Sequence, residues 1–268
     1  MKKLDHLAKI YKFYDIFIID LWGVMHNGIK LNESSINVVN NLYENNKKVI
    51  FLSNAPRPNK QVVQFLRKLK MDEKYLKNIL TSGEAALVSL KNKSFGTKFF
   101  HLGPERDNSL FVGMEKNKTN IKDSEFILCT GLFDNYENDL EYYKNLLKDN
   151  FSKKMICTNP DLIVHRGNEK EYCAGTIAKI FESIGGKVVY FGKPYRAVYD
   201  TIIKKNEKGL VIGDNLNTDI KGANNLNIDS IFITSGIHRS EFNEERELNG
   251  LVDKYNVTTK YFQENLTW

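Results

Sequence analysis

The stretch Phe17-Ile18-Ile19-Asp20-Leu21-Trp22-Gly23-Val24 decides the fold of this chain. The apolar run from Ile16 to Ile19 predicts a buried strand that delivers one carboxylate, Asp20, to its C-terminal end, and Gly23 follows soon after. In open α/β sheets, ligands bind just beyond the carboxyl ends of the strands, so Asp20 lies where chemistry takes place. Two residues after Asp20 stands Trp22, whose indole has no useful acid or base.

Strands and helices alternate along the chain, and we find no repeat or linker. We expect strands at 16–21, 48–52, 99–102, 126–130, 155–158, 188–191, 210–212 and 230–234 from their apolar runs. Helical spacing of apolar residues predicts helices at 34–44, 59–70, 82–90, 137–148, 174–184, 197–205 and 219–226. This alternation favours a parallel sheet in an α/β fold.

The composition excludes several classes of protein. The 268 residues, 41% of them hydrophobic, can form one large domain or two modest ones, and no apolar run is long enough to cross a membrane. The N-terminus lacks an apolar signal region, and three separated cysteines favour reduced thiols, so we expect a cytoplasmic protein. The net charge of +6 comes from scattered lysines, which favours a solvated surface over a nucleic-acid-binding stripe, although a local positive field for a phosphate substrate stays open.

Polar side chains follow three further predicted strands at the point where each strand ends. They are, in chain order, Ser53-Asn54, Gly192-Lys193-Pro194 and Gly213-Asp214-Asn215, with Thr218-Asp219 just beyond. Each of these alone is most often a turn or a helix cap. Together with Asp20 they place four polar groups at one edge of a parallel sheet, and they predict a single site there.

With these motifs the chain resembles the haloacid dehalogenase (HAD) superfamily, in the branch of the phosphatase NagD and the 4-nitrophenyl phosphatases. The resemblance covers nearly the whole chain. The segments that carry it are Asp20 with Gly23-Val24 and His26, Ser53-Asn54, Thr81-Ser82, Thr158-Asn159-Pro160-Asp161, Gly192-Lys193-Pro194, and Gly213-Asp214-Asn215 with Thr218-Asp219. It implies a Rossmann-like, doubly wound parallel-sheet core at residues 1–79 and 188–268, and an inserted α/β cap of type IIA at residues 80–187 that sets substrate specificity.

The resemblance also implies a role for each motif residue in the hydrolysis of a phosphate ester. Asp20 is the nucleophile that forms an aspartyl-phosphate, and Lys193 supplies a fixed positive charge against Asp20 and the phosphate. The Ser53 hydroxyl donates to a phosphate oxygen, with the Asn54 amide beside it. In the cap, Asp161 meets the polar end of the substrate. Structural alternatives stay open: Lys193 could be a surface lysine, and Ser53 a turn former or helix cap.

The same resemblance implies a Mg²⁺ site, since this ion prefers hard oxygen ligands in an octahedral shell with several waters. The implied protein ligands are the carboxylates of Asp20 and Asp214 and the backbone carbonyl of Trp22, while Asp219 orients the metal-bound waters. Asp219 could instead cap the helix that begins there.

Trp22 is where the chain departs from the family pattern. Related phosphatases have a second aspartate at this position, which protonates the leaving alcohol and later activates water against the aspartyl-phosphate. An indole N–H can do neither, and losing a general acid–base group costs on the order of 10²–10⁴ in rate. Three explanations stay open: substrates with good leaving groups, recruitment of another group such as His26, or ligand binding with little turnover. The indole itself could pack in the protein or stack on a substrate ring.

We therefore expect a Mg²⁺-dependent HAD phosphohydrolase that acts on a small phosphorylated metabolite with weakened acid–base catalysis. The alternative is a phosphate-ligand-binding or regulatory protein with vestigial catalysis, whereas a dehalogenase is disfavoured because the motifs build a cation and phosphate site. The expected partner is the phosphorylated substrate, with neither nucleic acid nor membrane, and a homo-oligomer stays open. Three more side chains could contact an anionic or sugar group or lie on the surface: Arg57, His165 and Arg166.

Overall fold

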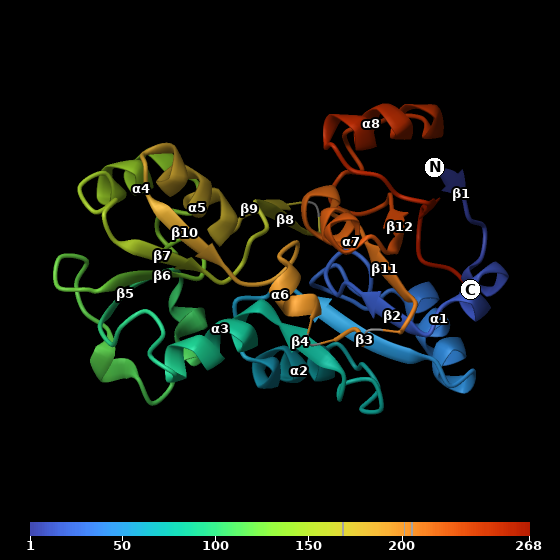
Figure 1. The fold of residues 1–268 in the computed structure, drawn as a ribbon, viewed down its shortest axis with the longest axis horizontal. Helices are drawn as coiled ribbons and strands as arrows, with labels where there is room; N and C mark the ends of the chain where they lie inside the picture. Colours follow the sequence, from blue (N-terminus) through green and yellow to red (C-terminus); the bar gives the residue numbers. More distant parts are fainter. Residues whose placement is uncertain (168, 201, 205) are drawn as a thin grey trace.

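The computed structural model describes residues 1–167, 169–200, 202–204 and 206–268, and it has two lobes, each built around a parallel sheet (Figure 1). Within these described ranges the larger sheet has the strand order β1-β13-β12-β11-β2-β3-β4, with every pair parallel. Its strands are β1 (Lys2–Lys3), β2 (Ile16–Ile19), β3 (Lys48–Ser53), β4 (Ile79–Thr81), β11 (Gly209–Gly213), β12 (Asp229–Ile233) and β13 (Tyr261–Gln263). We call this lobe the core.

Helices cover both faces of the core sheet. They are α1 (Glu33–Glu44), α2 (Asn59–Lys68), α6 (Arg196–Tyr199), α7 (Lys221–Leu226), preceded by a π-helical turn at Leu216–Ile220, and α8 (Leu248–Lys254). Ile16 and Ile18 of β2 pack with α6 and α7, whereas Phe17 and Ile19 pack on the opposite face with α1 and α2. Because both faces are covered, β2 is apolar along its whole length, which explains the run that opens the sequence.

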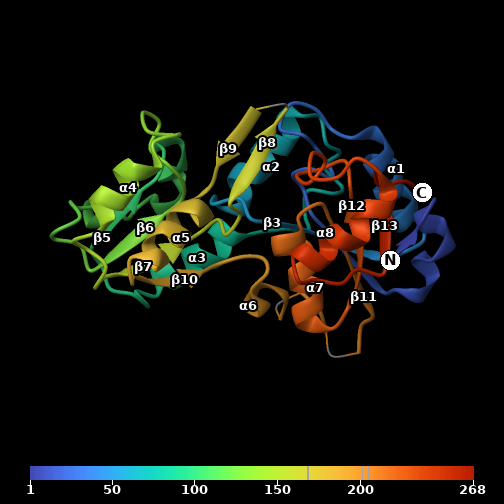
Figure 2. The ribbon, with the colours of Figure 1, turned by 90° about the horizontal axis from the view of Figure 1, so that it is seen from above.

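The smaller lobe, which we call the cap, is inserted between β4 and α6. Its sheet has the order β10-β7-β6-β5, again parallel, with α4 and α5 on one face and α3 on the other. Its elements are α3 (Ser82–Lys91), β5 (Phe99–Leu102), β6 (Phe126–Cys129), α4 (Leu140–Leu147), β7 (Lys154–Cys157), α5 (Ala174–Ser183) and β10 (Lys187–Tyr190). An antiparallel hairpin, β8 (Ile163–Arg166) and β9 (Glu169–Tyr172), lies between the cap sheet and the core (Figure 2).

The register of the core sheet explains how distant polar residues meet. Strand β2 pairs with both β11 and β3, and Ile19 lies opposite Ile212 on one side and Phe51 on the other. The three strands therefore end at the same edge of the sheet. That edge carries the first residue after β2, the last residue of β3 and the first residue after β11, which are Asp20, Ser53 and Asp214.

The chain passes from one sheet to the other slightly later than the predicted domain boundaries at residues 80 and 187. Strand β4 pairs with β3 as far as Thr81, so the chain leaves the core sheet there. Strand β10 pairs with β7 from Lys187 to Tyr190 and belongs wholly to the cap sheet, although residues 188–190 were predicted in the core. The sequence could not separate these cases, because a short apolar strand suits either sheet.

Several elements differ from the predicted ones. Strands β1, β4 and β13, the β8–β9 hairpin and α8 were not predicted. The helix expected at 137–148 begins only at Leu140, because the Asp139 carboxylate caps it by accepting from the Tyr142 N–H. The helix expected at 197–205 is shorter in the structure: α6 ends at Tyr199, residues 200 and 202–204 are not helical, and positions 201 and 205 lie outside the described residues. No helix in the described ranges is long and apolar enough to cross a membrane.

Candidate active site

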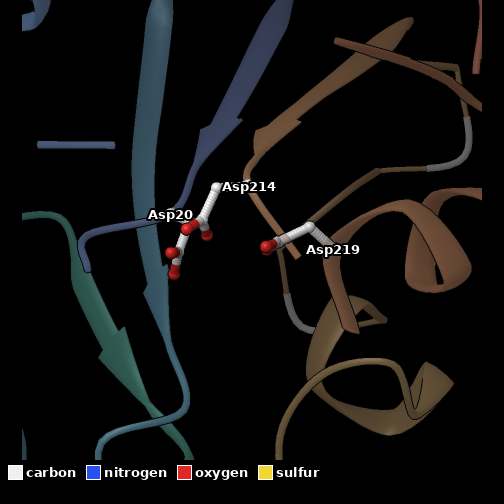
Figure 3. Close-up of side chains that lie close together, drawn as sticks. All are labelled: Asp20, Asp214 and Asp219. Atoms are coloured by element: carbon white, nitrogen blue, oxygen red, sulfur yellow. The ribbon is translucent and has the colours of Figure 1, made fainter. Parts of the chain in front are cut away.

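Three buried aspartates converge at the edge of the core sheet. Asp20 follows β2, Asp214 follows β11 and Asp219 lies in the π-helical turn, and Figure 3 shows their carboxylates facing one another. One oxygen from each carboxylate lies within 4.8 Å of the others. We call Asp20, Asp214 and Asp219 the acidic group.

The backbone at two glycines packs tightly against Asp214. Gly23, with φ of +90°, leaves no room for a side chain, because a Cβ there would lie 2.1 Å from Asp214 Oδ2. A Cβ on Gly236 would lie equally close to the same atom. The Ile237 N–H also donates to Asp214 Oδ2, at 2.8 Å. The two glycines and this hydrogen bond therefore hold Asp214 in one position.

Lys193 balances part of the negative charge of the acidic group. Its ammonium group is buried and donates to Asp219 Oδ1 at 2.7 Å and to Asp20 Oδ1. Burial opposes the charged form, but the carboxylates of Asp20 and Asp219 outweigh it and raise the pKa of Lys193, so the side chain stays protonated. The structure places Lys193 against Asp20, as expected, and excludes the alternative that Lys193 is a surface lysine.

Asp219 has protein partners for both of its oxygens. Oδ1 accepts from Lys193, and Oδ2 accepts from the backbone N–H of Asn215 at 3.1 Å. This arrangement favours a carboxylate that orients its neighbours over one that binds a cation directly, which agrees with the role that the family resemblance implies.

The acidic group holds more negative charge than Lys193 can balance. Burial raises the pKa of Asp20 well above its usual range, and the charges of Asp219 and Asp214 add to this effect. Burial, and then the charge of Asp219, raises the pKa of Asp214 to about 8. A buried set of hard oxygen donors with excess negative charge fits a divalent cation such as Mg²⁺.

The charge imbalance predicts how Mg²⁺ changes stability with pH. The pKa of folded Asp214, about 8, exceeds its ordinary value of 3.8, so the metal-free protein loses stability as the pH rises between these values. Because Mg²⁺ needs deprotonated ligands, we expect it to stabilise the protein more at about pH 8 than at about pH 5.5. At saturating Mg²⁺ and the higher pH, scanning calorimetry should show a rise in Tm of roughly 5 °C.

Asp214→Asn should remove most of this Mg²⁺-dependent rise, since it takes away a charged ligand. Asp200→Asn is the matched control, because Asp200 is an exposed carboxylate of the core lobe that pairs with Arg196. This variant should keep the Mg²⁺-dependent rise in Tm. An equal rise at both pH values, or an undiminished one in Asp214→Asn, contradicts a cation bound by the acidic group.

Ser53 and Asn54 lie at the end of β3, and their side chains form different hydrogen bonds. The Ser53 hydroxyl oxygen accepts the Ala55 N–H at 3.2 Å, which leaves its own hydrogen to donate to a ligand. The Asn54 side chain accepts the Lys193 N–H at 2.8 Å and donates to the Lys193 carbonyl at 3.1 Å and to Asp161 Oδ1 at 3.2 Å. Asn54 therefore positions Lys193 and Asp161, and its contact with phosphate stays a prediction.

Asp161 brings the cap to the acidic group. It follows β7 by four residues, and its Oδ1 accepts from the side-chain amides of both Asn54 and Asn215, each at 3.2 Å. Burial raises the pKa of Asp161 to about 6 despite the nearby charge of Lys193. A carboxyl with this pKa exchanges its proton near neutral pH.

A cavity of about 610 Å³ opens between the core and the cap. The residues predicted for the site all line this cavity: Asp20, Trp22, Ser53, Asn54, Asp161, Lys193, Asp214 and Asp219. The fold thus brings the predicted residues together in one place.

Two family models match this chain. One, described as haloacid dehalogenase-like hydrolase, matches residues 17–115, and the other, described as HAD-hydrolase-like, matches residues 190–256. Together they span more than half of the chain and include the acidic group, Ser53 and Lys193. The chain belongs to the haloacid dehalogenase-like hydrolases.

Similar proteins of this HAD family carry assigned activities. The acid sugar phosphatase of Staphylococcus haemolyticus is 24% identical over 88% of this chain and 91% of its own length. The ribonucleotide monophosphatase NagD of Escherichia coli is 32% identical over 31% of this chain and 34% of its own. The crystal structure of an HAD-like hydrolase from Brucella suis matches with a TM-score of 0.86 and 27% identity, over 98% of this chain and all of that one. The predicted family and fold are confirmed, and the chain is an HAD enzyme whose named relatives are phosphatases.

His26, which the sequence analysis considered as a substitute acid, is poorly suited to that role. The ring is buried, its Nδ1 accepts the Gly28 N–H at 3.0 Å, and it packs edge-on against Phe65. Burial lowers the pKa of His26 to about 4, so the ring is neutral near physiological pH, and the N–H of a neutral imidazole is too weak an acid to protonate a leaving group. The structure thus argues against His26 as the substitute acid.

Both arginines considered in the sequence, Arg57 and Arg166, have partners in the protein. The Arg57 Nε donates to the buried Asp107 of the cap at 2.7 Å, which joins the two lobes. Arg166 forms an ion pair of 2.8 Å with Glu171, across the β8–β9 hairpin. Both contacts favour structural roles over direct binding of a substrate anion.

The sequence analysis missed the segment 235–239, which holds Asp214 through Gly236 and Ile237. A signal was present, because Thr234-Ser235-Gly236 follows β12 in the same way that the predicted motifs follow their strands. Applying the same strand-end rule to β12 would have found it.

Proposed function

We propose that this protein is a Mg²⁺-dependent phosphohydrolase that acts on a small phosphorylated metabolite through an aspartyl-phosphate on Asp20. The observation that carries the proposal is the Lys193 ammonium, which is held between Asp20 and Asp219 beside the acidic group. This arrangement offers a nucleophile, a fixed cation and a cation site within one cavity. Mg²⁺ would be held by Asp20 and Asp214 and, as implied by the family, by the Trp22 carbonyl. The bound ion would neutralise charge on the phosphate.

The chain's own residues then suit each step of the reaction. An Asp20 oxygen attacks phosphorus, the bond from phosphorus to the ester oxygen breaks, and the leaving oxygen takes up a proton from solvent water. Water next attacks the phosphorus of the aspartyl-phosphate, which releases phosphate and restores the Asp20 carboxylate. Lys193 and the Ser53 hydroxyl stabilise the charged oxygens in both steps. Trp22 cannot carry the proton in either step, so we infer weakened acid–base catalysis.

The substrate class follows from the relatives and the cavity. The relatives named above act on sugar phosphates or ribonucleotide monophosphates, as their names say. A volume of about 610 Å³ suits a molecule of this size, and polar side chains from both lobes line it. We propose a small sugar or nucleotide monophosphate as the partner, a cytoplasmic setting, and no nucleic-acid or membrane partner, with self-association open.

Trp22 favours one alternative function, a phosphate-ligand-binding or regulatory protein with vestigial catalysis. Screening phosphorylated sugars and nucleotides with and without Mg²⁺ separates the two. Multiple turnovers that depend on Mg²⁺ support the phosphohydrolase, whereas tight binding without phosphate release on any substrate supports the binding protein.

Asp161→Ala should change substrate preference more than it changes Mg²⁺ binding, because the carboxylate is assigned to the polar end of the substrate. We expect kcat/KM to fall roughly tenfold for a sugar phosphate, as for the loss of one charged hydrogen bond, and less for a minimal aryl phosphate. Asp161→Asn is the matched variant, since its amide oxygen can still accept from Asn54 and Asn215. Equal losses on every substrate in Asp161→Ala, with full activity in Asp161→Asn, would instead indicate that the residue only supports Lys193 and the surrounding turn.

A further inference from the structure

The Trp22 side chain reaches from the core to the cap. Its indole N–H donates to the backbone carbonyl of His165, in β8, at 2.8 Å. The guanidinium carbon of the next residue, Arg166, lies 5.8 Å from the centre of the indole ring, in position for a cation–π interaction. Trp22 therefore contacts the β8–β9 hairpin through a hydrogen bond and through its ring face.

Core residues hold the indole in this orientation. The His26 ring meets it edge to face, with 5.2 Å between the ring centres, and Phe65 packs in turn against His26 at 5.4 Å. On another side, a Cβ on Gly28 would lie 2.7 Å from Trp22 Cζ2, so only glycine allows the backbone to approach the ring so closely. The indole is a fixed part of the core, and the hairpin docks against it.

The hairpin forms part of the cavity wall. Ile163, Val164 and His165 line the cavity together with the acidic group, and Figure 2 shows the hairpin between the lobes. Two weaker contacts to the core occur at Gly167, whose N–H donates to the Asn27 carbonyl at 3.4 Å and whose carbonyl accepts from Arg239 at 3.2 Å. The Trp22 hydrogen bond is the shortest of these three contacts.

We propose that Trp22 is a positioning residue, which fixes the β8–β9 hairpin against the core and thereby sets how large a substrate the cavity accepts. The size selection rests on the proposed phosphohydrolase function, whereas the positioning of the hairpin does not. Trp22 lies two residues after Asp20, so the hairpin is docked directly onto the segment that carries the nucleophile. The part of the substrate beyond the phosphate must fit under the docked hairpin or displace it from the indole.

Hydrogen–deuterium exchange of the peptide 163–172 tests the positioning directly. Trp22→Phe keeps an aromatic ring but removes the N–H donor to His165. We expect exchange in this peptide to become roughly threefold to tenfold faster, the effect of losing one hydrogen bond. The matched control is Trp268→Phe, because Trp268 packs against Tyr11 at the C-terminus, away from the hairpin, and should leave the exchange unchanged (Figure 1).

Arg239→Gln provides a second test that leaves the indole intact, since it removes the contact to the Gly167 carbonyl. It should also speed exchange of the hairpin, by a smaller factor than Trp22→Phe. If neither variant changes exchange in 163–172, the hairpin is held by other contacts and the proposal is overturned.

Kinetics test the selection of substrate size. In Trp22→Phe, the ratio of kcat/KM for a bulky nucleotide monophosphate to that for a minimal aryl phosphate should rise at least threefold, with the change mainly in KM. An unchanged ratio in a variant whose hairpin exchanges faster overturns the size selection. Absence of hydrolysis in the wild type on every substrate would count against the phosphohydrolase function, and the exchange result would stand by itself.

Discussion

Asp20→Asn should lower the rate of phosphate release by about 10³-fold or more, while the protein stays folded. The carboxamide is a poor nucleophile and cannot form the acyl phosphate. The fold should persist because Lys193 keeps its 2.7 Å contact with Asp219, and the substitution removes one of several mutually repelling buried charges. Steady-state phosphate release and calorimetric Tm are the measurements, with Asp200→Asn as the surface control. Wild-type-like turnover in Asp20→Asn would exclude the covalent mechanism.

Trp22→Asp should raise turnover on alkyl phosphates more than on aryl phosphates. Alkyl leaving groups need a proton, which a carboxylic acid at this position can supply, whereas aryl leaving groups depart readily. A fully effective acid–base group contributes on the order of 10²–10⁴ in rate, and we expect a gain at the low end of that range because the new carboxyl lacks supporting partners. In the wild type, the aspartyl-phosphate should be long-lived and visible as a phosphate adduct by rapid quench and intact-mass measurement.

Trp22→Asn is the matched control for this gain. Asparagine has the shape of aspartate and equally loses the hydrogen bond to His165, but it cannot transfer a proton. Both variants leave a cavity that can cost about 3–5 kcal/mol of stability, so Tm must be measured beside rate. If the wild type hydrolyses alkyl phosphates briskly without an adduct, and a folded Trp22→Asp is no faster than Trp22→Asn, another group supplies the proton. Asp161 would then be the residue to test next, because it lines the cavity and has a pKa of about 6.

The site could be predicted from the sequence where it depends on strand order alone. Asp20, Ser53 and Asp214 each lie at the end of an apolar strand, and parallel pairing of neighbouring strands brings such ends together. The position of Asp161 came instead from the family resemblance, because no local pattern connects a turn in the cap with a site in the core. The contacts that fix its side chain, the amides of Asn54 and Asn215, appear only in the folded protein.

Other features lay outside what local patterns contain. Strands β1, β4 and β13 have two or three residues each, too few for a periodicity to be recognised. The β8–β9 hairpin has polar and charged residues on short strands, and its docking depends on a backbone carbonyl, which every residue has. The sequence could therefore show that Trp22 is unsuited to proton transfer but not what its side chain contacts.

The close approach of backbone at Gly23 and Gly236 would bear on which cation the proposed site accepts. Ca²⁺ takes six to eight oxygen ligands at variable distances and needs surroundings that can expand, whereas Mg²⁺ takes a compact octahedron and keeps several waters. The backbone of both glycines lies close to the Asp214 carboxylate, which leaves little room for this ligand to shift and admit a larger ion. Discrimination between the two ions would then come from the stiffness of the polypeptide around one ligand, and a side chain in place of either glycine would disturb ion choice before it reached the nucleophile.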